Sequence, residues 1–218
     1  MRVFLSPKLR LSLSLLAAFC LWTALLCCLD VRPAGPEGSS VGLAGVNLWF
    51  HGLTGVHMGL YDLTDRLGLI PLATAAGFGM LGLYQWIRRK HLKFVDRSLI
   101  LLGIFYAAVI GMFILFELFP VNFRPVLIAG AMEASYPSST TLLCLCVMPT
   151  AAMQLRQRIT RPGLRTAAVL LVWLFTAFMV ICRLISGVHW LSDIIGGILL
   201  SAGLVTLYDA LNHPVKKA

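Results

Sequence analysis

The stretch RLISGVHWLSD, residues 183–193, interrupts a chain that is otherwise dominated by apolar side chains. Hydrophobic residues make up 59% of the 218 residues and charged residues only 12%, and the mean hydropathy is +0.86. Arg183, His189 and Asp193 nevertheless stand between two long apolar runs. Ionisable groups near the hydrocarbon of a membrane are costly, and those present commonly serve a function. The stretch therefore bears on the fold and on a candidate site.

The apolar runs on both sides of this stretch belong to a set of six. A helix needs about 20 apolar residues to cross the hydrocarbon core, and lipid cannot satisfy open backbone groups. The sequence therefore predicts an all-α, polytopic membrane protein that forms a single integral membrane domain over residues 1–218. The six predicted transmembrane helices cover residues 11–29, 67–87, 98–119, 139–155 (which contains Pro149), 166–184 and 190–207.

The basic residues are distributed unevenly over the two sides of this six-helix arrangement. The side with only four of them carries Arg32, Arg66, Arg124 and Arg183, and the other side carries the remaining 14 of 18. Loops rich in Lys and Arg stay in the cytoplasm, so we expect both termini there and residues 183–193 outside. The net charge of +9 then reflects topology and contact with membrane lipids, and we expect no nucleic-acid partner. A bacterial plasma membrane is the expected location.

The spacing of His189 and Asp193 predicts a catalytic pair. Four residues apart at the start of a helix, they share one face. An aspartate there can accept from one imidazole nitrogen and leave the other free as a nucleophile or base. Arg183, at the end of the preceding helix, can bind a phosphate through two parallel hydrogen bonds. The alternative is a histidine that caps loop carbonyls and an arginine that reaches the lipid headgroups.

Two further polar clusters fall on the same predicted side. They are ELFPVNFRP (residues 117–125), which contains Arg124, and SYPSSTT (residues 135–141). Pro137, Ser138 and Ser139 resemble a helix start, whose free amides attract anions, although plain capping would explain them too. Two arginines, a helix N-terminus and a His–Asp pair together favour phosphoryl transfer over other reactions.

These residues resemble the motifs of the type 2 phosphatidic acid phosphatases, membrane lipid phosphatases related to the vanadium haloperoxidases. The family pattern is KxxxxxxRP, PSGH and SRxxxxxHxxxD in six-helix proteins. This chain reads ELFPVNFRP, PSST and CRLISGVHWLSD, with Cys182 in place of the serine. The resemblance covers residues 60–210, which leaves residues 1–59 as an N-terminal anchor helix and an outer interfacial loop.

The resemblance implies metal-independent hydrolysis of a lipid phosphate or diphosphate on the outer side. By this resemblance His189 attacks phosphorus to form a phosphohistidine, and Asp193 orients it. The phosphate-binding residues would be Arg124, Arg183, Ser138 and Ser139, with Ser139 in the place of the family's glycine. No cofactor is expected, and the partners are the lipid substrate and membrane lipids.

Two positions depart from the family pattern. Glu117 replaces the phosphate-binding lysine, and Thr140 replaces the histidine that protonates the leaving group. A diphosphate needs less help from an acid than a monoester does, so Thr140 favours a lipid diphosphate such as a polyprenyl diphosphate carrier. Alternatively, Glu117 or a histidine from residues 47–65 (His51 or His57) donates the proton.

The same departures leave a second class of function open. The chain could be a catalytically impaired family member that acts as a lipid-binding or accessory membrane protein. A transporter is less well supported, because the sequence has no clear inverted repeats and no midplane charge pair.

Overall fold

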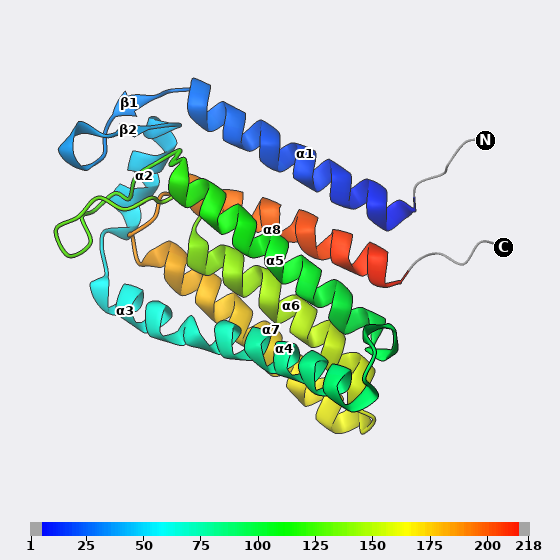
Figure 1. Cartoon of the computed structure of the whole chain (residues 1–218). Coiled ribbons are helices and arrows are strands. Elements are labelled where there is room, and N and C mark those ends of the chain that lie inside the picture. Colours follow the sequence, from blue (N-terminus) through cyan, green and yellow to red (C-terminus); the bar gives the residue numbers. More distant parts are fainter. Residues whose placement is uncertain (1–5, 214–218) are drawn as a thin grey trace, which may run out of the picture.

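The long helices lie side by side in one bundle (Figure 1) in a computed structural model that describes residues 6–213. Each of the six predicted runs forms a helix, with ends a few residues from those expected, which confirms the all-α class. Between the first two runs the chain forms two additional short helices. The bounds are α1 Pro7–Cys28, α2 Ala44–Thr54, α3 Met58–Leu67, α4 Leu69–Arg89, α5 Arg97–Leu118, α6 Ser139–Arg158, α7 Pro162–Ile185 and α8 Leu191–Asn212.

Five helical segments within the described residues are long and apolar enough to cross a membrane. They are α1, α5, α7, α8 and the combined segment Met58–Arg89, in which α3 leads into α4 through Gly68. The sixth predicted crossing, α6, forms a helix but does not pass this test. It packs against α4, α5, α7 and α8, and more than half of its residues are buried. Neighbouring helices rather than lipid surround α6, so its polar side chains are tolerated, and the helix continues through Pro149.

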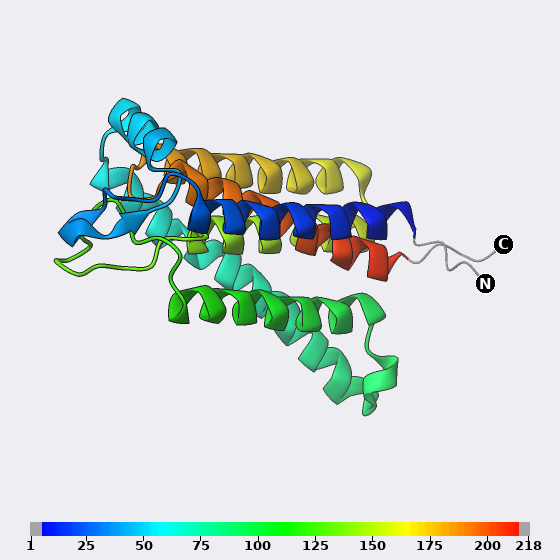
Figure 2. The same ribbon diagram turned by 90° about the horizontal axis from the view of Figure 1, so that it is seen from above.

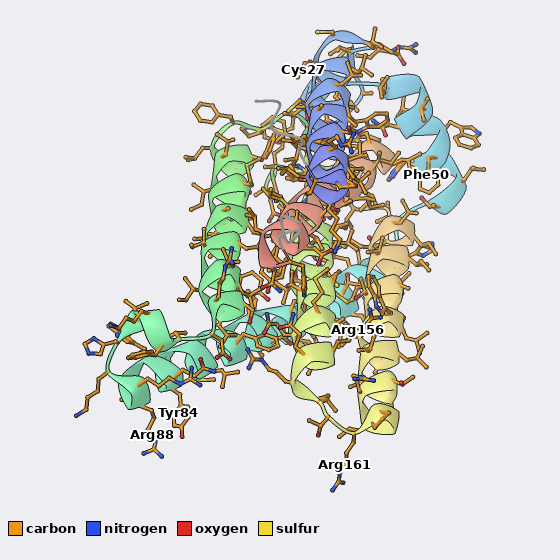
Figure 3. The ribbon with its side chains drawn as sticks, turned by 90° about the vertical axis from the view of Figure 1, so that its right-hand side faces the viewer. Cys27, Phe50, Tyr84, Arg88, Arg156 and Arg161 are labelled. Atoms are coloured by element: carbon orange, nitrogen blue, oxygen red, sulfur yellow. The ribbon has the colours of Figure 1, made fainter. Side chains whose placement is uncertain are left out.

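The irregular segments gather at one end of the bundle (Figures 1 and 2). They include the antiparallel pair β1 (Arg32–Pro33) and β2 (Ser40–Val41), joined by a short 3₁₀ helix η1 (Pro36–Gly38). The α5–α6 connection and the short α7–α8 loop lie at the same end. The opposite end of the bundle holds the α4–α5 link with its 3₁₀ helix η2 (Leu92–Phe94) and the α6–α7 turn. The first turn of α1 and the last turn of α8 lie there too, and Arg88 and Arg161 extend from this end (Figure 3). Which end faces the cytoplasm stays a prediction.

The N-terminal helix packs along α8, and its polar side chains bond to that helix. Ser12 Oγ donates to the carbonyl of Gly203 at 2.8 Å, where a Cβ on the glycine would lie 2.7 Å from the Leu16 side chain. Nearer the looped end, Trp22 Nε1 donates to the carbonyl of Ser192 at 3.1 Å. The Trp22 bond thus connects α1 to the start of α8, where the candidate site lies.

Candidate phosphate-binding active site

The looped end of the bundle brings the predicted site residues together and buries them. Arg124 comes from the α5–α6 connection, Arg183 from the last turn of α7, and His189 from the α7–α8 loop. Arg124 is 7% exposed, Arg183 1% and His189 3%, and Asp193 in the first turn of α8 is fully buried. Charged side chains are seldom buried to this degree unless they are paired or functional.

Asp193 accepts hydrogen bonds on both carboxylate oxygens. Its Oδ2 accepts from the backbone amide of Trp190 at 2.9 Å, and its Oδ1 accepts from Asn122 Nδ2 at 3.3 Å. Ser135 Oγ also donates to Oδ2, at 2.5 Å. The bond from the Trp190 amide belongs to the capping box of α8, so the first turn of this helix fixes the position of the Asp193 carboxylate.

The imidazole of His189 contacts Asp193 through an intervening serine. His189 Nδ1 lies 3.8 Å from Asp193 Oδ2, beyond hydrogen-bonding distance, but 3.0 Å from Ser135 Oγ. The other ring nitrogen, Nε2, is buried and has no partner within the described residues. The ring therefore presents one tethered and one free nitrogen.

Burial lowers the pKa of His189 from about 6.5 to about 4. Interaction with Asp193 acts in the opposite direction, and the positive charges of Arg124 and Arg183 lower the pKa further. The imidazole is therefore neutral at physiological pH, which is the form in which Nε2 has a free lone pair.

Tyr61 on α3 packs against both arginines. The guanidinium carbon of Arg183 lies 4.7 Å from the ring centroid and that of Arg124 lies 5.6 Å from it. Arg183 Nη1 also donates to Thr64 Oγ1 at 3.1 Å, and Arg124 Nε lies 3.1 Å from Glu133 Oε2. Because the Glu133 side chain is 41% exposed, an incoming anion can displace it.

Polar atoms without partners concentrate at this site. Nine buried side-chain nitrogen and oxygen atoms within the described residues lack a hydrogen-bond partner, and five of them belong to four predicted site residues: Arg124 Nε, Arg124 Nη1, Ser138 Oγ, Arg183 Nε and His189 Nε2. Buried polar groups are otherwise almost always paired. Ser138 is the N-cap of α6, and its side chain makes no capping bond, so the first amides of α6 and these atoms together suit a phosphoryl group.

A cavity of about 240 Å³ opens beside Arg124. Its lining includes Ser135, Ser139, Glu117 and Glu133, with Phe113, Phe116 and Tyr136. Glu117 therefore does reach the surroundings of the site, although it carries the charge opposite to that of the lysine it replaces. The second carboxylate, Glu133, was not singled out in the sequence.

A second, apolar cavity of about 460 Å³ shares Phe113, Ser139 and Leu142 with the first. Thr140 lines this cavity, and so does the carboxylate residue Asp65 at the end of α3. Its walls are otherwise mostly aliphatic side chains of α4, α5 and α6. The position of the family's leaving-group acid thus lies beside a space suited to a hydrocarbon chain.

Two candidate acids from the outer loop lie elsewhere. His51 packs against Trp190, with ring centroids 5.5 Å apart, and His57 Nε2 lies 2.9 Å from the carbonyl of Thr54. Neither histidine lines the two cavities. Residues 47–65 form most of α2 and most of α3 at the looped end, and they contribute Tyr61 and Thr64 to the surroundings of the site.

The sequence reasoning missed Ser135, Asn122, Tyr61 and Thr64. Ser135 and Asn122 lay within the two polar clusters that it did identify, but no periodicity directs either side chain toward Asp193. Their contacts are fixed by backbone bonds between the two halves of the α5–α6 connection, where the amide of Ser135 donates to the carbonyl of Asn122 at 2.9 Å. Such loop pairing depends on tertiary structure.

The structure is thus a bundle of apolar helices that carries a buried histidine, a buried aspartate and two buried arginines at one end. Residues 117–213 match the family model of the PAP2 superfamily. This segment holds the arginines, Ser138, His189 and Asp193, and over it the chain is similar to the PAP2 superfamily.

A solved structure supports the same fold over nearly the whole chain. The transmembrane PAP2 type phosphatidylglycerolphosphate phosphatase from Bacillus subtilis superposes with a TM-score of 0.63 at 17% identity, and the alignment covers 94% of this chain and 98% of that one. The curated proteins gave no significant match.

Proposed function

We propose that this chain hydrolyses a lipid phosphate or diphosphate at the looped end of the bundle through a phosphohistidine intermediate. The observation that carries the proposal is the set of five buried atoms without a hydrogen bond on Arg124, Arg183, Ser138 and His189, of which Arg124 Nε has only its ion pair with Glu133. A phosphoryl group supplies acceptors for the donors among them, and its phosphorus is the electrophile that the free Nε2 lone pair can attack.

Each residue then has a role set by its contacts. His189 Nε2 forms the bond to phosphorus, and Asp193 supplies a negative charge on the Nδ1 side of the ring. Arg183 and Arg124 bind the equatorial oxygens, with Ser138, Ser139 and the first amides of α6 on the remaining side. Water then attacks the phosphohistidine to release phosphate and regenerate the neutral imidazole.

The apolar cavity beside the site supports a lipid substrate. Its aliphatic walls would hold the first part of an acyl or isoprenoid chain while the headgroup lies against Arg124. The substrate of the Bacillus subtilis protein named above is also a lipid phosphate, phosphatidylglycerolphosphate. For this chain we favour a lipid diphosphate, because Thr140 cannot protonate a leaving alkoxide.

Phosphate release from a substrate panel tests the proposal. Purified protein in detergent micelles is given phosphatidic acid, phosphatidylglycerolphosphate or a polyprenyl diphosphate, and inorganic phosphate is measured. We expect release from at least one, abolished by His189→Ala and kept by His213→Ala. His213 is the matched control, because it pairs with Asp209 at the other, exposed end of α8.

The alternative function, a lipid-binding or accessory protein, predicts a different result. Such a protein would retain lipid phosphates in the purified complex but release no phosphate from any member of the panel, and His189→Ala would change only the amount of lipid retained.

A further inference from the structure

Ser135 occupies the position between the two members of the His–Asp pair. Its Oγ lies 3.0 Å from His189 Nδ1 and donates to Asp193 Oδ2, while His189 Nδ1 and Asp193 Oδ2 are 3.8 Å apart. Ser135 is 2% exposed, so water does not compete for these bonds. Within the proposed function, Ser135 is the direct neighbour of the nucleophile.

The chemistry of the three groups fixes the direction of both bonds. An ionised carboxylate only accepts, so the single proton of the Ser135 hydroxyl goes to Asp193. Ser135 Oγ then has only lone pairs to offer His189, and Nδ1 must carry the ring proton. The remaining nitrogen, Nε2, is left unprotonated, and it is buried without a hydrogen-bond partner among the described residues.

We propose that Ser135 is a positioning residue that sets the tautomer of His189 and keeps the imidazole from pairing directly with Asp193. The proposal rests on the function proposed above and adds a residue outside the three family motifs. A direct carboxylate contact would stabilise the protonated ring, in which Nε2 has no lone pair, more strongly than the contact through the serine does. The serine transmits orientation while limiting that effect.

The reaction step balances without moving the Nδ1 proton. The Nε2 lone pair forms the N–P bond as the bond from phosphorus to the leaving oxygen breaks. The ring keeps its Nδ1 proton and becomes a positively charged phosphoimidazolium, stabilised by the Ser135 lone pair and by Asp193 beyond it. Hydrolysis by water restores the neutral ring.

A neighbouring serine provides a matched control. Ser192 is also buried, and its Oγ lies 3.4 Å from Asp193 Oδ1, where it also accepts from Asn47 Nδ2 at 2.9 Å. Ser192 thus contacts the other oxygen of the Asp193 carboxylate, but it makes no hydrogen bond to His189. A merely structural role for Ser135 predicts that Ser135→Ala and Ser192→Ala behave alike.

The experiment measures the tautomer and the pH profile of the full chain in detergent. With ¹⁵N-labelled histidine, and with His189 assigned by its loss in His189→Gln, the wild type should show a protonated Nδ1 and an unprotonated Nε2. Ser135→Ala should lose this pattern, while Ser192→Ala and Ser135→Thr, which keeps the hydroxyl, should retain it. An Nε2-protonated wild type would overturn the proposal whether or not the protein turns over.

The kinetic arm uses the best substrate of the panel. Ser135→Ala should lower kcat by about 10²-fold with little change in KM, since the nucleophile is misoriented while phosphate binding is kept. Removing a donor from Asp193 raises the proton affinity of the pair, so the acid limb of the kcat profile should move to higher pH. An active wild type with an unchanged acid limb and tautomer in Ser135→Ala would refute the role of Ser135 alone, whereas an inactive wild type would refute the proposed function. If Ser135→Ala does not fold, Ser135→Cys, with its weaker donor, is measured in the same way.

Discussion

The imidazole of His189 and the carboxylate of Asp193 are four residues apart in the sequence yet 3.8 Å apart in space, too far for a direct hydrogen bond. The separation arises because Asp193 caps its own helix through the amide of Trp190 while His189 precedes that helix. The carboxylate therefore serves two purposes, and a third side chain connects it to the ring.

The low pKa of His189 predicts a pH-dependent stability. The ring is neutral in the folded chain down to about pH 4, whereas in the unfolded chain it takes up a proton near pH 6.5. This contribution is present above pH 6.5 and is lost as the pH falls toward 4, up to about 3 kcal/mol at about 1.4 kcal/mol per pKa unit. Thermal unfolding in detergent between pH 7.5 and pH 4.5 should show a smaller loss in His189→Gln than in wild type. An equal loss in both would contradict the assignment.

Arg183→Lys should reduce kcat/KM by about 10²-fold, the typical loss for one oxyanion donor. A lysine keeps the charge but cannot both bond Thr64 and stack on Tyr61 while it presents a second donor to phosphate. Arg161→Lys, at the opposite end of α7, is the control and should leave the rate unchanged. Equal rates for all three proteins would remove Arg183 from the phosphate site.

Thr140→His should raise monoester hydrolysis selectively, because expelling an alkoxide needs a proton and a positioned acid contributes about 10²–10⁴-fold. Wild type should prefer a polyprenyl diphosphate over phosphatidic acid. If Glu117 or Asp65 supplies the proton instead, Glu117→Gln or Asp65→Asn should slow the monoester more than the diphosphate. Equal turnover of the two substrates, insensitive to all three substitutions, would refute the leaving-group argument.

Filling the apolar cavity should affect long-chain substrates alone. Leu143→Trp projects an indole into the space that the proposal assigns to the lipid chain. We expect KM for a long-chain lipid to rise about tenfold, which is about the effect of losing the contacts of one methylene in an apolar pocket. The KM for a short soluble phosphate should not change. Leu174→Trp is the control, because Leu174 lies on the surface of α7 and is 57% exposed. Equal KM shifts for long and short substrates would show that the lipid chain does not bind in this cavity.

Gly187→Ala should destabilise the α7–α8 loop. Gly187 has φ +68°, and a Cβ there would lie 1.8 Å from the carbonyl oxygen of Gly55, so both the conformation and the packing require glycine. We expect a melting temperature several degrees lower, at about 2–4 °C per kcal/mol for a chain of this size, with loss of turnover. Gly79→Ala, where a Cβ meets no atom within 4 Å, is the control. A melting temperature equal to that of wild type would show that the loop tolerates a side chain.

The apolar runs predicted the six long helices because their length and composition are local properties of the sequence. The His189–Asp193 spacing and the helix start at Ser138 could likewise be identified locally. The network around them could not, since Asn122, Tyr61 and Thr64 reach the site only through the packing of the α5–α6 connection and α3. The short fourth run with its Pro149 also indicated a helix that its neighbours could shield, and α6 is indeed buried among four helices, which replace the apolar surface that a lipid-facing helix needs.

The phosphohistidine itself is the most direct test of the proposed mechanism. Wild-type protein is mixed with a ³²P-labelled polyprenyl diphosphate carrying the label at its terminal phosphate, quenched in alkali, which preserves phosphohistidine, and digested for peptide mapping. The proposed mechanism predicts that the label is bonded through Nε2 to the peptide that contains His189. The label should be retained in His213→Ala, and both label and turnover should be absent in His189→Ala. Full turnover in His189→Ala, or turnover in wild type with no label on that peptide at any quench time, would contradict it.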